Sequence, residues 1–263
     1  MNIVVCVKQV PDTWAEKKLS PTDKTVDRES VDGVMNELDE YAVEEALRIK
    51  ESNGDTGEVT VLTMGPDKSV ETIRKALSMG ADSAVHVVDP GLHGSDALAT
   101  SYALAKALAT IPHDLVILGV ESTDARMSVV PAMLAERLGA AQLTYARKVE
   151  INGSTVKVER LTDSGYDVVE AQTPAVVSVV EKINEPRYPS FKGIMAAKKK
   201  EIAAASPADL GLDPSQIGAA GSRLEIVSVS FPESGKGAQM LEGDAKAAAA
   251  KLVEKLQKEA RVL

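Results

Sequence analysis

Short apolar runs alternate with segments of helical periodicity through the first half of the chain. The runs are residues 3–7, 59–62, 84–88 and 115–118. Continuous apolar runs of this length are typical of strands that are buried on both faces of a sheet. Because a helical segment follows each run, the pattern predicts an α/β fold in which a parallel sheet carries helices on both faces.

The helical segments begin and end at typical capping residues. Asn36 stands at the N-cap position of a helix over 37–52, and Asn53-Gly54 follows its end. In this helix Leu38, Ala42, Ala46 and Ile49 are expected to face the core. A second helix, which Ser69 caps and Gly80 ends, would do so through Val70, Ile73 and Leu77. The expected core positions are Leu98, Tyr102, Ala105 and Ala109 in residues 96–110, and Met127, Val130, Leu134 and Leu138 in the helix after residue 118. The carboxylate pairs Asp39-Glu40 and Glu44-Glu45 are expected on the solvated surface of the first helix.

The pattern changes after Gly139. Residues 144–151 and 155–161 predict a β-hairpin, because Asn152-Gly153 between them supplies residues that tolerate the positive φ of a tight turn. A further apolar strand is expected at 175–180.

Beyond this strand the chain is rich in Pro and Lys, and from 206 to 243 it shows little periodicity. An amphipathic helix is expected from Asp244. We therefore predict an α/β domain over residues 1–205, with the hairpin at 144–161 as an extension, and a C-terminal arm over residues 206–263.

Composition narrows the possible functions. The 263 residues are 44% apolar and 26% charged, which excludes a wholly disordered chain. The net charge of −9 argues against nucleic acid as the main partner. No apolar run approaches the ~20 residues of a membrane-spanning helix, and no signal segment precedes residues 3–7, so a cytoplasmic protein without membrane insertion is expected. The single cysteine, Cys6, and three histidines without HxxxH spacing give no metal site.

The loop after residues 115–118 is the first candidate for chemistry. The chain lacks the GxGxxG, GxxxxGK[ST], GxSxG and HExxH motifs, so no common nucleotide or hydrolase motif competes with it. Ligands of open parallel sheets bind beyond the carboxyl ends of strands, where a helix N-terminus offers N–H groups to phosphate. Ser122 and Thr123 add hydroxyl groups there, and Arg126 adds a cation. The alternative is that Ser122-Thr123-Asp124 only caps the following helix.

Phe191 is the second candidate. It is one of two phenylalanines, and it stands among Pro and basic residues rather than in an apolar run. A large apolar side chain in such a loop is typical of a docking contact with another protein. The alternative is that it packs back onto its own domain.

Several ordered blocks of the chain carry a family resemblance. They are residues 4–10, 36–39, 42–46, 75–82, 119–124 and 173–177, and, most specific, Asn184-Glu185-Pro186-Arg187-Tyr188 and Ile194-Met195-Ala196-Ala197-Lys198-Lys199-Lys200. Together these blocks, which span most of the chain, resemble the beta (small) subunit of electron-transfer flavoproteins.

The resemblance implies a carrier without an active site of its own. Such a beta subunit pairs with an alpha subunit that holds most of the FAD, and it buries a structural AMP in a Rossmann-like nucleotide-binding domain. The heterodimer takes electrons from acyl-CoA dehydrogenase-type flavoenzymes, as in fatty acid oxidation, and passes them to a membrane quinone oxidoreductase. The C-terminal arm would contact the alpha subunit.

The resemblance also assigns residues to two sites. The residues carried over to the AMP pocket are Cys6, Asn36, Glu37, Leu38, Asp39, Met64, Ser122, Thr123, Asp124, Ala125, Arg126, Met127, Ser128, Val129, Val130, Pro131, Ala132 and Met133. The recognition loop, 184–195, would dock the dehydrogenase through Arg187, Tyr188, Pro189, Ser190, Phe191, Lys192, Ile194 and Met195. The resemblance favours nucleotide binding over helix capping for the loop at Ser122.

The chain departs from the family pattern at three places. Residues 125–128 stand where many members carry glycine after Thr-Asp, and Phe191 stands where the docking residue is often Leu. Leu161 stands where an acid near the flavin is usual. Two alternatives remain open: a bifurcating relative with a second FAD in the nucleotide slot that oxidises NADH, and a stand-alone nucleotide-binding module.

Overall fold

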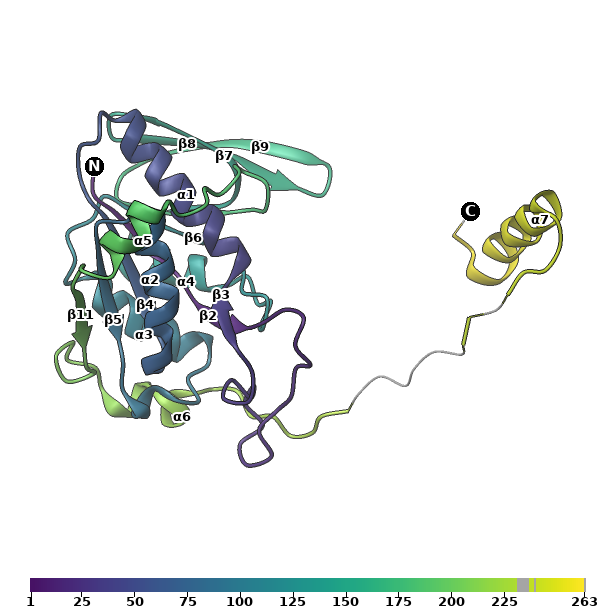
Figure 1. Ribbon diagram of the computed structural model, residues 1–263, viewed down its shortest axis with the longest axis horizontal. Coiled ribbons are helices and arrows are strands. Elements are labelled where there is room, and N and C mark those ends of the chain that lie inside the picture. The colour runs from purple at the N-terminus through teal and green to yellow at the C-terminus, as the bar shows by residue number, and fades with distance from the viewer. Residues whose placement is uncertain (231–236, 239, 263) are drawn as a thin grey trace. The chain divides into compact units, whose positions relative to one another are not determined.

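The computed structural model describes residues 1–230, 237–238 and 240–262, and the chain divides into two compact units, residues 1–225 and 226–263. The larger unit is built on a nine-stranded sheet (Figure 1) with the order β11-β5-β4-β1-β6-β10-β7-β8-β9. In that order the strands are Ile202–Ala205, Ser83–Val87, Val59–Met64, Ile3–Cys6, Leu115–Gly119, Ala175–Val179, Ala141–Asn152, Thr155–Thr162 and Gly165–Gln172. The pairs from β11 to β7 are parallel, which confirms the predicted α/β fold.

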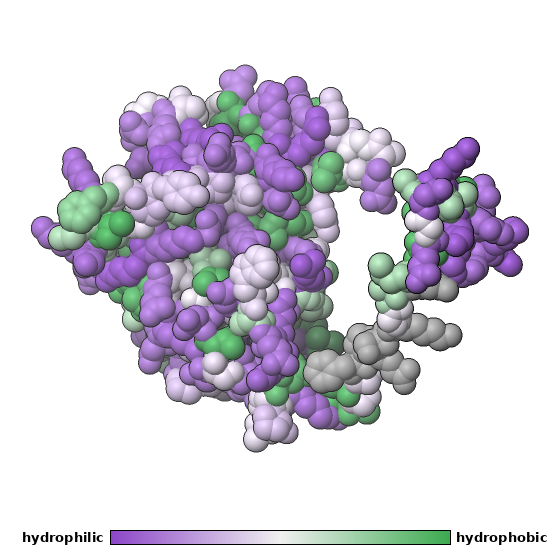
Figure 2. All heavy atoms as spheres, turned by 45° about the vertical axis from the view of Figure 1, so that its right-hand side comes forward, coloured by the Kyte–Doolittle hydropathy of each residue, from purple (hydrophilic) through white to green (hydrophobic). Residues whose placement is uncertain are grey.

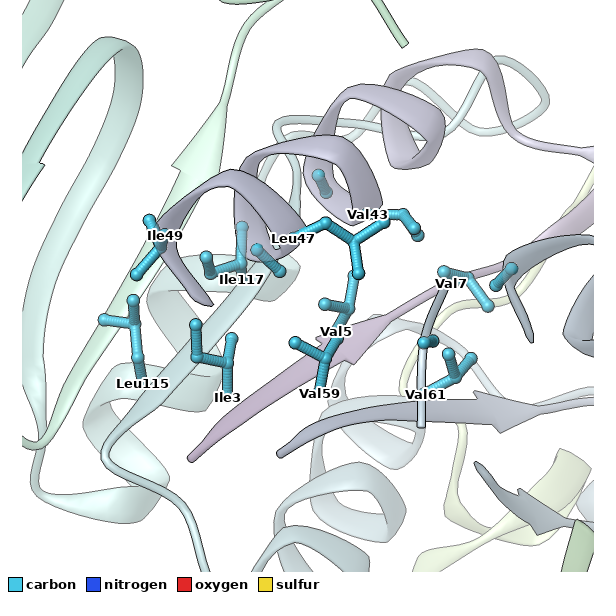
Figure 3. Packing of buried hydrophobic residues seen from close by; sticks show 14 of the residues in the cluster. Ile3, Val5, Val7, Val43, Leu47, Ile49, Val59, Val61, Leu115 and Ile117 are labelled. Atoms are coloured by element: carbon cyan, nitrogen blue, oxygen red, sulfur yellow. The ribbon is translucent and has the colours of Figure 1, made fainter. Parts of the chain in front are cut away.

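Helices cover both faces of this sheet. They are α1 Glu37–Ser52, α2 Val70–Met79, α3 Ala97–Leu108, α4 Val130–Leu138, α5 Phe191–Ala197 and α6 Gly218–Gly221. On one face α1 and α2 close an aliphatic core, and Figure 3 shows Val43, Leu47 and Ile49 of α1 packed over the apolar side chains of β1 and β6. On the other face, α3 and α4 close a second core around Leu108 and Leu134. A separate pair of short strands, β2 Gln9–Pro11 and β3 Gly33–Met35, leads into α1.

The predicted faces of α3 and α4 are correct only in part: Tyr102 and Ala105 of α3, and Val130, Leu134 and Leu138 of α4, pack in the second core. In α3 the buried positions include Ala99, Ala103 and Leu104, whereas Leu98 is exposed. Met127 lies outside α4, which begins at Val130, and is also exposed. In α1, by contrast, the predicted positions Ala42, Ala46 and Ile49 are all buried.

The antiparallel part of the sheet is larger than the predicted hairpin. The hairpin of β7 and β8 exists, with Gly153 at φ +60° in its turn, and β9 adds a third antiparallel strand after a turn at Asp163-Ser164. Because β7 also pairs in parallel with β10, the hairpin continues the main sheet.

The segment after residue 205 does not begin a separate arm as predicted. Leu212 and Ile217 are buried in the second core, and the Gly218 amide donates to Ser95 Oγ at 2.8 Å. The Arg223 amide donates to Asp96 Oδ2 at 2.7 Å. The compact unit therefore extends to Glu225, and the predicted boundary after residue 205 lies too early.

The second unit contains helix α7, Ala245–Lys255, which continues as a π-helical turn over Leu256–Ala260. The helix begins after Asp244 as predicted, and the structure shows that Asp244 caps it, since its side chain accepts from the Ala247 amide at 2.8 Å. Residues 231–236, 239 and 263 of the predicted arm lie outside the described residues. Within the described ranges no helix has the length and apolar character needed to cross a membrane. The face drawn in Figure 2 is mostly hydrophilic, with small, separate hydrophobic patches.

Candidate functional site

The order in which successive strands are added to the sheet reverses at β1. After β1 the chain places β4 and β5 on one side, and then returns to place β6 and β10 on the other. Cys6 stands opposite Leu62 in β4 and Leu118 in β6, so the carboxyl ends of these strands meet at one edge. This edge is where open α/β sheets bind their ligands.

Asn36 ties the start of α1 to the loop after β6. It is fully buried and occupies the predicted N-cap position, but its side chain makes no capping hydrogen bond. Instead, Asn36 Nδ2 donates to the Glu121 carbonyl at 2.9 Å, and Asn36 Oδ1 accepts from the Thr123 amide at 3.0 Å. The two predicted parts of the pocket, the start of α1 and the loop at Ser122, are therefore adjacent.

Asp39 joins the same strands from within α1. The prediction that it lies on a solvated surface is wrong: the carboxylate is buried and accepts from the amides of Lys8 at 2.8 Å and Gly119 at 3.2 Å. Burial raises the pKa of Asp39 to about 7, against the opposing effect of these donors. Only glycine fits at 119, because a Cβ there would lie 2.6 Å from Asp39 Oδ1.

Asp124 lies between two cations. Its side chain is only 1% exposed, and its oxygens lie 2.9 Å from Lys8 Nζ and 2.5 Å from an Arg28 Nη atom. Burial alone would raise the pKa of Asp124, but Lys8 and Arg28 outweigh it and hold that pKa at about 2. Since α4 begins only at Val130, Asp124 does not cap it, and the capping interpretation of this loop is wrong.

Three buried polar atoms at this cluster have no hydrogen-bond partner among the described residues. Two are donors, Thr123 Oγ1 and Arg28 Nη1, and the third is the acceptor Asp124 Oδ2, which lies 2.5 Å from the other Arg28 Nη atom in an ion pair. Buried donors in folded proteins nearly always have a partner. Since Lys8, Arg28 and Asp124 together carry a formal charge of +1, the residues present fit a ligand with anionic oxygen acceptors.

The loop keeps a glycine-like backbone without glycine. Arg126 and Ser128 have φ of +49° and +55°, in the left-handed region that side chains disfavour. Two hydrogen bonds hold this path: the Arg126 amide donates to the Ser122 carbonyl at 2.8 Å, and Ser128 Oγ donates to Glu121 Oε2 at 2.7 Å. The Arg126 side chain is exposed.

The other residues predicted for the pocket differ in exposure. Cys6 is buried in the second core, where burial raises the pKa of its thiol to about 12. Pro131 is also buried; Glu37, Ala125 and Met127 are exposed; and Leu38, Met64, Val129, Val130, Ala132 and Met133 are half-buried.

The predicted recognition loop is partly helical. Ser190 caps α5, which begins at Phe191, by accepting from the Gly193 amide at 3.0 Å. Tyr188 is 96% exposed and Phe191 is 80% exposed, so the interpretation that Phe191 packs onto its own domain is wrong. Of the other residues predicted for this loop, Lys192, Ile194 and Met195 are exposed and Pro189 is half-buried.

Comparison with known proteins identifies the chain. The family model described as "Electron transfer flavoprotein domain" matches residues 23–210. The chain belongs to the electron transfer flavoprotein family. It is 54% identical over 239 residues to the electron transfer flavoprotein subunit beta of Mycobacterium bovis, covering 89% of this chain and 90% of that protein.

Two further relatives span nearly the whole chain. The electron transfer flavoprotein subunit beta of Thermoanaerobacterium thermosaccharolyticum is 41% identical over 257 residues, or 97% of this chain and 98% of that protein. The caffeyl-CoA reductase-Etf complex subunit CarD of Acetobacterium woodii is 37% identical over 244 residues, or 92% of each. The family resemblance drawn from the sequence blocks is thereby confirmed.

Sequence reasoning missed two residues of this candidate site, Lys8 and Arg28. Lys8 could have been found, because it follows a buried strand whose carboxyl end lies at the ligand-binding edge. Arg28 carries no such signal. It lies between β2 and β3, in a segment without periodicity, and only the fold brings it to Asp124.

Proposed function

We propose that this chain is the beta subunit of a heterodimeric electron carrier. An alpha subunit would hold most of the FAD, which supplies the redox chemistry when bound. The heterodimer takes electrons from flavin dehydrogenases of the acyl-CoA dehydrogenase type and delivers them to a membrane quinone oxidoreductase, working from the cytoplasm. This chain contributes a nucleotide site, a docking surface and a contact with the alpha subunit.

AMP is the nucleotide proposed for the site at the carboxyl edge. The observation that carries this proposal is the pair of buried donors without partners, Thr123 Oγ1 and Arg28 Nη1. Thr123 and Arg28 would donate to phosphate oxygens, and Lys8 adds positive charge. No side chain caps the start of α4, and Pro131 in its first turn carries no N–H, so the amides of Val130 and Ala132 are the first-turn donors that could face an anion.

The test is to denature the purified protein and identify what it releases. About one AMP per chain is expected. Thr123→Val should reduce the retained AMP about tenfold, because it removes a hydrogen bond to a charged group worth ~1.5–3 kcal/mol. Thr72→Val is the matched control, since Thr72 Oγ1 on α2 is equally buried and also lacks a partner in the described residues.

Two results would contradict the AMP proposal. Folded protein that releases no nucleotide would exclude a structural ligand at this site. Release of FAD in place of AMP would favour the bifurcating alternative, in which the same slot holds a second flavin.

The contact with the alpha subunit is proposed for residues 226–263. No described side chain of α7 is buried, and Leu252 and Val253 remain half-exposed. Val227 and Met240 are more exposed still. A segment that leaves this much apolar surface uncovered fits a surface that a second chain covers.

A further inference from the structure

Arg187 is held by a buried carboxylate of α1. Glu44 is 3% exposed, although the sequence pattern placed it on a solvated surface. Arg187 Nε donates to Glu44 Oε2 at 2.7 Å and Arg187 Nη2 to Glu44 Oε1 at 3.1 Å, so the pairing is bidentate. The Arg187 amide also donates to Glu44 Oε2, at 3.2 Å. Two further residues extend the network: Arg48 lies 2.8 Å from Glu44, and Glu51 lies 2.5 Å from Arg187.

The same segment is fixed on the amino-terminal side of Arg187. Asn184 Nδ2 donates to the Tyr41 carbonyl at 3.0 Å and to Glu45 Oε2 at 2.9 Å. Glu45 is therefore a second buried carboxylate of α1 that contacts residues 184–190, rather than part of a solvated surface.

The segment is also fixed at its carboxyl end, on α2. Arg74 donates from Nη1 to the carbonyls of Ala197 at 2.6 Å and Lys200 at 2.5 Å, at the end of α5. Gly193 lies so close to α2 that a Cβ would meet the Ser78 carbonyl oxygen at 2.5 Å. The chain is therefore fixed on both sides of Tyr188 and Phe191, whereas these two large side chains lie almost entirely in solvent.

We propose that the Glu44–Arg187 ion pair is a positioning device for docking. It holds residues 184–190 against α1, so that Tyr188 and Phe191 are already in the arrangement that enters an apolar pocket of the flavin dehydrogenase. This inference rests on the docking function proposed above. A segment ordered in advance loses less conformational entropy on binding, which strengthens docking without any contact between Glu44 and the partner.

The experiment uses the complete heterodimer as the varied substrate of the dehydrogenase. Flavin reduction is followed by absorbance, and KM and kcat are measured separately. Glu44→Gln should raise KM about tenfold and leave kcat unchanged, because it weakens docking but not the step after it. Glu40→Gln is the matched control: Glu40 lies on the same helix and pairs with Lys75 of α2 instead of residues 184–190, so KM should not change.

A double-mutant cycle with Phe191→Ala separates positioning from general stabilisation. If Glu44 acts by placing Phe191, Glu44→Gln should raise KM much less in the Phe191→Ala background than in the wild type. Should Glu44→Gln reduce the yield of folded heterodimer, Arg187→Lys provides the same comparison, because lysine keeps the charge but cannot pair in bidentate fashion.

The outcomes distinguish the two proposals. An unchanged KM for Phe191→Ala alone would overturn the docking function, and the positioning role with it. A raised KM for Phe191→Ala, combined with an unchanged KM for both Glu44→Gln and Arg187→Lys, would leave docking intact and overturn the positioning role. Effects of Glu44→Gln and Phe191→Ala that simply multiply would overturn it as well.

Discussion

Phe191→Ala should separate docking from folding. Because the Phe191 side chain is 80% exposed, its truncation removes little buried surface, and the free energy of unfolding should change by no more than about 0.5 kcal/mol. Burying the ring in a partner's pocket is worth ~1.5–3 kcal/mol, so docking to the dehydrogenase should weaken about ten- to a hundredfold. A core phenylalanine would instead cost ~3–5 kcal/mol of stability.

Melting temperature and dehydrogenase-driven flavin reduction should be measured on the same heterodimer preparation. The expected result for Phe191→Ala is an unchanged melting temperature, unchanged bound FAD and AMP, and slower reduction at limiting heterodimer concentration. Leu98→Ala is the control, since Leu98 is another exposed apolar residue, on α3 at the opposite face of the sheet. A large drop in melting temperature would show that Phe191 belongs to the core, and normal reduction at every concentration would show that it does not dock the dehydrogenase.

Three other perturbations test separate parts of the structure. Arg126→Ala should lower AMP retention about tenfold if the side chain reaches the phosphate; retention equal to the wild type would show that it stays in solvent. A chain that ends at Glu225 should remain folded but no longer co-elute with the alpha subunit, and full co-elution would show that residues 226–263 are dispensable. The cations beside Asp124 hold its pKa at about 2, below the ordinary value near 4. The ionised Asp124 therefore stabilises the fold above pH ~4, and the free energy of unfolding should fall by about 2 kcal/mol as the pH falls from about 4 to about 2. Acid titration of unfolding should show this loss for the wild type and a smaller one for Asp124→Asn; equal curves would contradict the assignment.

The parallel sheet could be predicted because its strands carry their own signal. Strands buried on both faces are continuously apolar, as in residues 3–6 and 115–118, and no information from elsewhere in the chain is needed to find them. β9 was missed for the opposite reason, since most of its residues are exposed and polar residues alternate weakly along it. The face of α3 was predicted only in part because alanines occur all around this helix, so its sequence shows no single apolar stripe.

The candidate site could be predicted only in part. Strand ends and a loop of small polar residues located it at Ser122 and Thr123, where local sequence is informative. The buried carboxylates could not be predicted, because the arginine that neutralises Glu44 lies 143 residues away in the chain. A glutamate in a helix is normally solvated, and only the fold shows that residues 184–190 cover Glu44 and Glu45.

The proposed electron carrier pairs this chain with an FAD-binding alpha subunit. The most direct measurement is the flavin absorbance of the co-purified heterodimer during stepwise reduction. We predict one FAD per heterodimer, bleached by an acyl-CoA dehydrogenase with its substrate and not by NADH alone. Two flavins per heterodimer, or bleaching by NADH without a dehydrogenase, would contradict the account.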